Sequence, residues 1–186
     1  MKARLAILTI LMAGVSSACL VVALDRFYDE PTIIFDERLL GAWLDADDNV
    51  TVTVARSDWR GYRVQYVHPT ETRVLSAYLF KVRDTLYLDL SPPRGEDAGL
   101  FLLPAHTLLR VTIGPREITV APLNFDWFSD ALTKKALPAD LHVARGERNQ
   151  VVLGADRAGL VRWLGARSET DPAFGEPVVF RKASSW

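Results

Sequence analysis

The sequence predicts a mainly β fold, an antiparallel barrel of about eight to nine strands with two short helices after an N-terminal apolar segment. Two observations predict it. From Leu39 onward, short segments alternate apolar and polar residues with a period of two, and turn residues separate them at the spacing of a meander. So many sequential hairpins favour a closed or nearly closed barrel, because closure removes exposed sheet edges. A two-sheet sandwich is the alternative.

The expected strands follow one another along the whole folded part. Residues 50–54 show the pattern most clearly, because three valines alternate with two threonines. Gly114-Pro115-Arg116 is a tight turn between two strands. The expected strands are residues 50–54, 62–66, 73–83, 86–90, 109–113, 117–121, 141–144, 150–153 and 176–182.

Two short helices interrupt the strands. Asp126 is placed to cap the first, which carries Trp127 and Phe128 and ends before Pro138. Asp156 is placed to cap the second, and Gly165 is placed to end it.

The N-terminal segment combines two basic residues, Lys2 and Arg4, with an uncharged apolar run over residues 5–24. One interpretation is a signal peptide with a lipoprotein-type cleavage site, after which Cys19 is lipidated. The other is one uncleaved transmembrane helix, since twenty residues span about 30 Å. Both predict a membrane-anchored domain on the extracytoplasmic (periplasmic) side of the cell envelope. A plain cleaved signal peptide is the third alternative. We therefore divide the chain into residues 1–24 (signal peptide or anchor), 25–38 (a spacer, from which residues 33–35 could pack on the domain) and 39–186 (barrel domain).

Charge and cysteine content exclude several classes of protein. The net charge is −1, and without residues 1–24 the chain has 20 basic and 23 acidic residues, or −3. A nucleic-acid binder is expected to carry a basic excess. Cys19 is the only cysteine, so the folded part has no disulfide, thiol nucleophile or cysteine metal site.

The run Leu39-Leu40-Gly41-Ala42-Trp43 resembles the start of lipocalin-like (calycin) barrels, whose first strand opens with Gly-x-Trp. In that family a late arginine often packs across the tryptophan near the base of the barrel, and Arg181 is the candidate here. The chain also resembles uncharacterised bacterial envelope lipoproteins. The matching segments are the Leu-x-Gly-x-Trp start, a middle segment at residues 103–111 and a Gly-Glu-Pro-x-x-Phe-Arg end at residues 175–181.

Aromatic residues on consecutive strands are the candidates for ligand binding. If several face the barrel interior, they could line an apolar pocket with a few hydroxyl groups that orient a ligand. The simpler interpretation is that they fill the core of a small barrel. The candidates are Trp43, Tyr62, Tyr66, Tyr78, Phe80 and Tyr87.

No motif in the sequence indicates an enzyme, a metal site or a cofactor site. The run Asp45-Ala46-Asp47-Asp48-Asn49 begins like a calcium loop, but Val50 and Arg56 stand where such a loop needs Gly and Glu. An acidic hairpin turn is the simpler interpretation. The three histidines, His68, His106 and His142, lie in no metalloprotease spacing. We therefore expect no catalytic residue, no metal and no cofactor.

The sequence leads to two functional hypotheses. The first is a tethered barrel that holds a lipid or another small apolar ligand. The alternative is a protein–protein interaction module of the cell envelope, with a filled core and an outer surface that docks a partner. The volume of the barrel interior separates them, because pockets for drug-sized ligands measure roughly 300–1,000 Å³.

Overall fold

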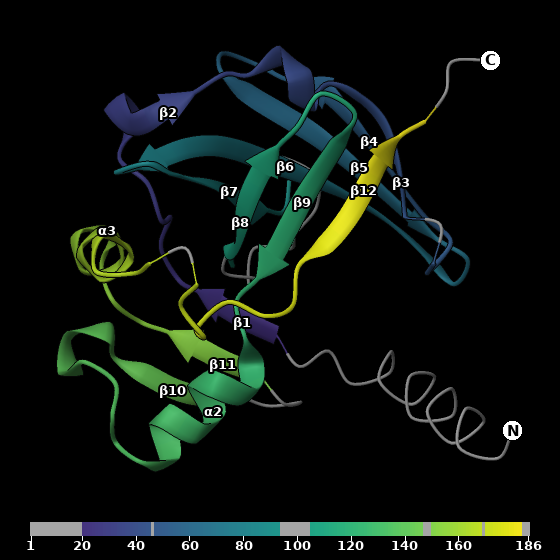
Figure 1. The fold of residues 1–186 in the computed structure, drawn as a ribbon. Helices are drawn as coiled ribbons and strands as arrows, with labels where there is room; N and C mark the ends of the chain where they lie inside the picture. The colour runs from purple at the N-terminus through teal and green to yellow at the C-terminus, as the bar shows by residue number, and fades with distance from the viewer. Residues whose placement is uncertain (1–19, 46, 94–104, 147–149, 169, 184–186) are drawn as a thin grey trace, which may run out of the picture.

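The fold is described from a computed structural model, which describes residues 20–45, 47–93, 105–146, 150–168 and 170–183. Figure 1 shows a β-barrel with a smaller layer of strands and helices packed beside it. Cys19, the candidate lipidation site, lies outside the described residues, as does most of the expected N-terminal apolar segment.

The barrel is built from eight antiparallel strands, and the pairing of β6 with β7 closes it. Around the barrel the order is β6-β5-β4-β3-β12-β9-β8-β7. The strands are β3 (Gly41–Asp45), β4 (Val50–Arg56), β5 (Gly61–His68), β6 (Glu71–Val82), β7 (Thr85–Ser91), β8 (Thr107–Ile113), β9 (Glu117–Pro122) and β12 (Val178–Lys182). The closed antiparallel barrel is confirmed, and it is consistent with a lipocalin-like fold.

Alternation along each strand decides which side chains face the barrel interior. On β4, Val52 lines the interior whereas its neighbour Thr53 is exposed on the outside. The expected turn at Gly114 joins β8 to β9, and its N–H donates to the carbonyl of Glu117 (2.8 Å). The acidic run after Asp45 joins the antiparallel strands β3 and β4 as a hairpin connection.

A separate three-stranded sheet lies beside the barrel (Figure 1). Its strands are β1 (Leu20–Ala23), β10 (Val143–Gly146) and β11 (Gln150–Leu153). β10 and β11 form the expected hairpin, but they do not belong to the barrel. β1 pairs with β11 in parallel, which brings the start of the described chain into this sheet.

Two α-helices, α2 (Phe125–Thr133) and α3 (Arg157–Gly165), accompany the small sheet (Figure 1). The expected cap of α3 is confirmed, because Asp156 Oδ1 accepts a hydrogen bond from the N–H of Gly159 (2.7 Å). The expected cap of α2 is wrong by two residues. Asn124, and not Asp126, caps that helix, since its side-chain oxygen accepts from the N–H of Trp127 (3.1 Å).

Residues 25–38, which we expected to be a spacer, pack on the barrel. Phe27 and Ile33 are fully buried. The segment contains strand β2 (Ile33–Ile34), which pairs with β6 outside the closed barrel. Short 3₁₀ helices flank β2 at η2 (Glu30–Thr32) and η3 (Glu37–Leu39), and a third, η4 (Ala139–Leu141), precedes β10.

The last residues of the expected apolar segment form a strand. Val21 and Ala23 of β1 are buried, so residues 20–23 belong to the folded domain rather than to the end of a membrane helix. None of the helices in the described parts of the chain has the length and apolar character needed to cross a membrane.

The buried side chains form two clusters. The inner cluster lies within the barrel and includes Trp43, Tyr62 and Leu79. The outer cluster lies between the barrel wall and the small sheet with its helices. It contains Val21, Ala23, Phe27, Tyr28, Ile33, Phe80, Tyr87, Leu108, Ala121, Leu123, Phe128, Leu141, Val151, Leu153, Ala155, Leu160, Trp163, Leu164, Ala173 and Phe174.

Candidate ligand-binding cavity

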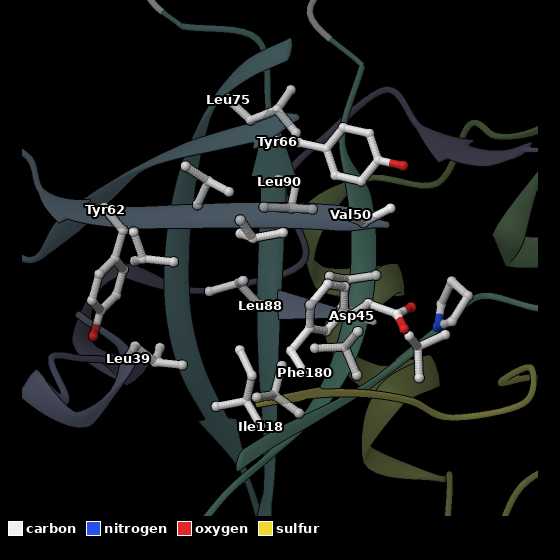
Figure 2. Close-up of a pocket in the computed structure, with 18 of the residues that line it drawn as sticks. Leu39, Asp45, Val50, Tyr62, Tyr66, Leu75, Leu88, Leu90, Ile118 and Phe180 are labelled. Atoms are coloured by element: carbon white, nitrogen blue, oxygen red, sulfur yellow. The ribbon is translucent and has the colours of Figure 1, made fainter. Parts of the chain in front are cut away.

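The barrel interior contains a cavity of about 390 Å³. Every strand of the barrel except β3 contributes an aliphatic or aromatic side chain to its wall, and β3 contributes Asp45. Figure 2 shows Leu39 and Tyr62 on one side of this cavity and Asp45, Val50 and Tyr66 on the other. The apolar part of the lining is Leu39, Val50, Val52, Val54, Val64, Leu75, Leu88, Leu90, Leu109, Val111, Ile118, Val120, Pro122, Val178 and Phe180.

One end of the cavity is closed by the segment that precedes β3. Leu39 of η3 lines the cavity and is buried. Phe35 stacks on the ring of Tyr62, with ring centroids 4.8 Å apart. The hydroxyl of Tyr62 accepts from the N–H of Asp36 (2.7 Å) and lies 3.2 Å from the carbonyl of the same residue, to which it donates. These bonds use the polar atom of Tyr62, so this end offers a ligand mainly apolar surface.

The opposite end carries the polar side chains of the cavity, and we call Asp45, Asp48, Tyr66 and Arg73 the mouth. Asp48 and Arg73 are exposed, so this end reaches solvent. Arg73 is paired with a carboxylate on its own strand, because its Nη2 lies 3.0 Å from Glu71 Oε2. The cavity is thus an apolar chamber with one charged end that is exposed to solvent.

Two of the six aromatic ligand-binding candidates, Tyr62 and Tyr66, line the cavity, one at each end. Tyr78, Phe80 and Tyr87 face the other way and pack in or against the outer cluster. Their ring contacts are with other aromatic residues there. For example, the rings of Phe80 and Tyr87 are 5.6 Å apart. These three residues fill a core outside the barrel, which neither interpretation of the aromatic pattern predicted.

Trp43 belongs to the inner cluster and is fully buried. Its indole N–H donates to the carbonyl of Leu39 (2.8 Å), which ties β3 to the segment that closes the barrel. The residue that covers its ring is Lys182, whose Nζ lies 5.4 Å from the ring centroid. The expected partner was Arg181. Arg181 pairs with Leu44, whereas Lys182 pairs with Trp43. The expectation was therefore wrong by one residue, and neighbouring residues of a strand point to opposite faces of the sheet.

Asp45 is a cavity residue that the aromatic pattern did not predict. Only 7% of it is exposed, and its Oδ1 accepts a hydrogen bond from the N–H of Asp47 (3.1 Å). The sequence placed it in an acidic turn. Its position as the last residue of β3, two residues after the inward-facing Trp43, is the signal that would have identified it.

A second buried carboxylate, Asp89, lies outside the barrel and beneath the small sheet. It is 1% exposed. His106 Nδ1 lies 2.7 Å from its Oδ1, and the N–H of Phe27 donates to its Oδ2 (2.9 Å). Burial raises the pKa of Asp89, although both hydrogen bonds favour the charged form. The backbone of His106 also pairs with Ala23, so this group joins the N-terminal segment to the barrel wall.

The remaining histidines have local roles. His68 Nδ1 lies 2.8 Å from Thr70 Oγ1 in the turn between β5 and β6. His142 follows η4 with a left-handed backbone (φ 46°). Among the residues that the structure describes, no three His, Cys, Asp or Glu side chains are grouped so that they could hold a metal ion. The lining of the described cavity supports binding by apolar contact, with charged side chains at the mouth.

Comparisons of the chain with protein-family models, with curated proteins and with solved structures find no match in any of the three. The function is therefore argued from the cavity and its surroundings alone.

Proposed function

We propose that this protein is a tethered extracytoplasmic domain whose barrel binds a lipid or another small apolar molecule. The observation that carries the proposal is the cavity of about 390 Å³, whose surface is almost wholly apolar. Ligand pockets measure roughly 300–1,000 Å³ and are lined mainly by apolar side chains. The alternative hypothesis, an interaction module, started from a filled barrel, and a cavity of this size favours the ligand-binding hypothesis.

The two ends of the cavity support the same function. The closed end presents Leu39 and the ring of Tyr62, whose hydroxyl is already bonded to Asp36. The mouth presents charged side chains and reaches solvent. An elongated molecule with an apolar tail and a polar head matches this polarity, because burying the tail removes apolar surface from water.

The position of β1 favours a lipid anchor over a transmembrane helix. Because residues 20–23 form a buried strand, the apolar run before it shortens to residues 5–19. Fifteen helical residues span only about 22 Å, less than the hydrocarbon core of a bilayer. A lipid on Cys19 would place the small sheet directly at the membrane. This agrees with the resemblance to envelope lipoproteins, which rests on the sequence motifs.

The first test is whether the cavity can be occupied. Residues 20–186 include every described strand and both buried clusters, so we expect this part to fold without the preceding residues. It is produced in a bacterial envelope, purified without detergent and examined by native mass spectrometry. We expect a reproducible extra mass that is lost on denaturation, and binding of a neutral naphthylamine dye whose emission rises in apolar surroundings.

A matched pair of variants locates the binding. Val52→Trp fills the cavity, whereas Thr53→Trp adds the same ring on the exposed side of the same strand. We expect the first variant to lose the extra mass and the dye signal, and the second to keep both. A bare polypeptide mass without dye binding, or equal loss in both variants, would contradict ligand binding in the barrel.

The tether has its own test. Metabolic labelling with a fatty acid should mark the full-length wild-type chain and leave Cys19→Ala unlabelled. An unlabelled wild type would contradict the lipid anchor without affecting the ligand-binding proposal.

A further inference from the structure

Acidic groups dominate the mouth of the cavity. Among the described residues, two carboxylates of the mouth line the cavity, Asp45 and Asp48. Two more lie next to the mouth: Asp47, between them in the sequence, and Glu71, on the neighbouring hairpin. The only cation among the described lining residues is Arg73. Its guanidinium already contacts Glu71, since its Nε donates to Oε2 (3.1 Å). A ligand head group at the mouth therefore meets a net negative charge.

The pKa of the Tyr66 hydroxyl group responds to the same negative charge at the mouth. Burial raises the pKa of Tyr66, and the neighbouring carboxylates raise it further: Glu71, Asp48 and Asp45. A negative field disfavours the tyrosinate and equally disfavours any anionic group brought to this point. A fatty acid or a phospholipid phosphate at the mouth would meet this repulsion.

Asp45 differs from the other acids because it is buried where the chamber meets the mouth. It is 7% exposed, and Figure 2 shows its side chain on the same side of the cavity as Val50. Its described contact is the local hydrogen bond from the N–H of Asp47. Removing a carboxylate from water costs free energy unless charged or polar partners compensate. A cationic group on the ligand would supply that compensation.

We propose that the cavity selects single-chain amphiphiles with a cationic head group, with the tail in the apolar chamber and the head against Asp45 and Asp48. This rests on the proposed function and adds the class of ligand to it. Arg73 does not recruit an anionic head, because its charge is balanced by Glu71.

The test compares three probes with the same tail: dodecylamine, dodecanol and dodecanoic acid. Each displaces the neutral dye from residues 20–186 at neutral pH, at concentrations below the micelle concentration of the amine and the acid and below the solubility of the alcohol. We expect the amine to bind about tenfold more tightly than the acid, with the alcohol between them. The preference should shrink as salt is added, since exposed charges are screened. Equal affinities, or tighter binding of the acid, overturn the inference while the proposed function stands.

Charge-neutralising variants identify the groups responsible. Asp45→Asn should bring the amine-to-acid ratio close to one and leave dodecanol binding unchanged. Asp48→Asn, at an exposed position, should lower the ratio less and keeps the test valid if Asp45→Asn fails to fold. Arg73→Gln should leave the ratio unchanged or raise it. A loss of acid binding in Arg73→Gln with no effect of either aspartate variant would assign the mouth to anions. If neither dodecanol nor the dye binds, the proposed function itself fails.

Discussion

The inner and outer clusters of the molecule differ in how completely they are filled. Thirteen of the described Leu, Ile, Phe, Tyr and Trp side chains are less than 2% exposed, and ten of them belong to the outer cluster. The inner cluster contributes Trp43, Tyr62 and Leu79 to this group, and it surrounds a cavity of about 390 Å³. The tightly packed core of this barrel protein therefore lies outside the barrel.

We expect this difference to separate the residues that stabilise the fold from those that are proposed to bind a ligand. Packed side chains contribute dispersion contacts and apolar burial that an empty chamber cannot supply. The outer cluster joins β1, the barrel wall and both helices, so it can hold the closed barrel in shape while the interior stays open. We infer that the outer cluster supplies most of the stability and that the inner wall is free to vary with the ligand.

The same substitution in each cluster tests this division. Leu160→Ala, in the outer cluster on α3, should lower the free energy of unfolding by about 3 kcal/mol, because it leaves a new void in a filled core. Leu88→Ala, in the cavity wall, enlarges an existing space around a half-buried residue and should cost about 1 kcal/mol. Denaturant unfolding measures both. A larger loss for Leu88→Ala would reverse the roles assigned to the two clusters.

Asp89 is the polar group on which the outer cluster depends most. Asp89→Ala should lower the free energy of unfolding by roughly 3 kcal/mol, because it leaves the N–H of Phe27 and the ring of His106 without their buried partner. Asp89→Asn keeps acceptor capacity and should cost less. Denaturant unfolding of the two variants compares them, and an equally small effect of both would mean that the buried hydrogen bonds contribute little.

The titration of Asp89 should contribute to the pH dependence of the free energy of unfolding. Its pKa is raised in the folded state, mainly by burial, so the folded chain holds this proton more tightly than the unfolded chain. Its contribution to stability is therefore largest below the ordinary aspartate pKa and is lost as the pH rises through the folded pKa. The charged groups that act on it are His106 and Arg26, and it acts in turn on Tyr28. The wild type should lose more stability than Asp89→Asn as the pH rises above about 4; identical pH profiles would contradict this.

The strands could be predicted because the alternation of apolar and polar residues is local in the sequence. Which part of the molecule packs against each face of a strand could not be predicted. Tyr87 and Asp89 alternate with Leu88 on β7, which correctly predicts a strand. Nothing in that pattern says that Tyr87 would lie against Phe174 or that Asp89 would bind the N–H of Phe27, because both partners are distant in the sequence. For this reason the sequence could name Tyr78, Phe80 and Tyr87 only as candidates for the barrel interior, as cavity lining or as core filling.

The N-terminal residues are a second place where the sequence alone could not predict the structure. An apolar run over residues 5–24 has the composition of a membrane segment along its whole length. The boundary at β1 depends on a parallel pairing with β11, whose residues lie more than a hundred positions later. Likewise, Phe27 and Ile33 are buried by contacts with strands that are distant in the sequence. The mixed composition of residues 25–38 therefore predicts a spacer, although the segment packs on the barrel.

Gly41 should matter more than other glycines because of its backbone. Its φ of +124° is one that L side chains rarely adopt, whereas the space around a Cβ there is ordinary, with Lys182 Cε at 3.5 Å. Gly41→Ala should therefore lower the free energy of unfolding by about 2 kcal/mol through backbone strain. Gly165→Ala, at the end of α3 with nothing within 4 Å of an added Cβ, is the control. It should be neutral or slightly stabilising in denaturant unfolding, and equal losses at both sites would argue against strain.

The smallest expected effect concerns the closed end of the barrel, where neighbouring residues on β12 have opposite roles. Lys182→Ala removes the cation over the ring of Trp43 and should lower the free energy of unfolding by about 0.5–1 kcal/mol. Arg181→Ala, on the other face of the strand, should change it by less than about 0.5 kcal/mol. Denaturant unfolding at low salt resolves the two. A larger effect of Arg181→Ala would mean that the register of β12 against β3 is shifted by one residue. Phe180 would then leave the cavity wall, and the inner cluster would lose its ring.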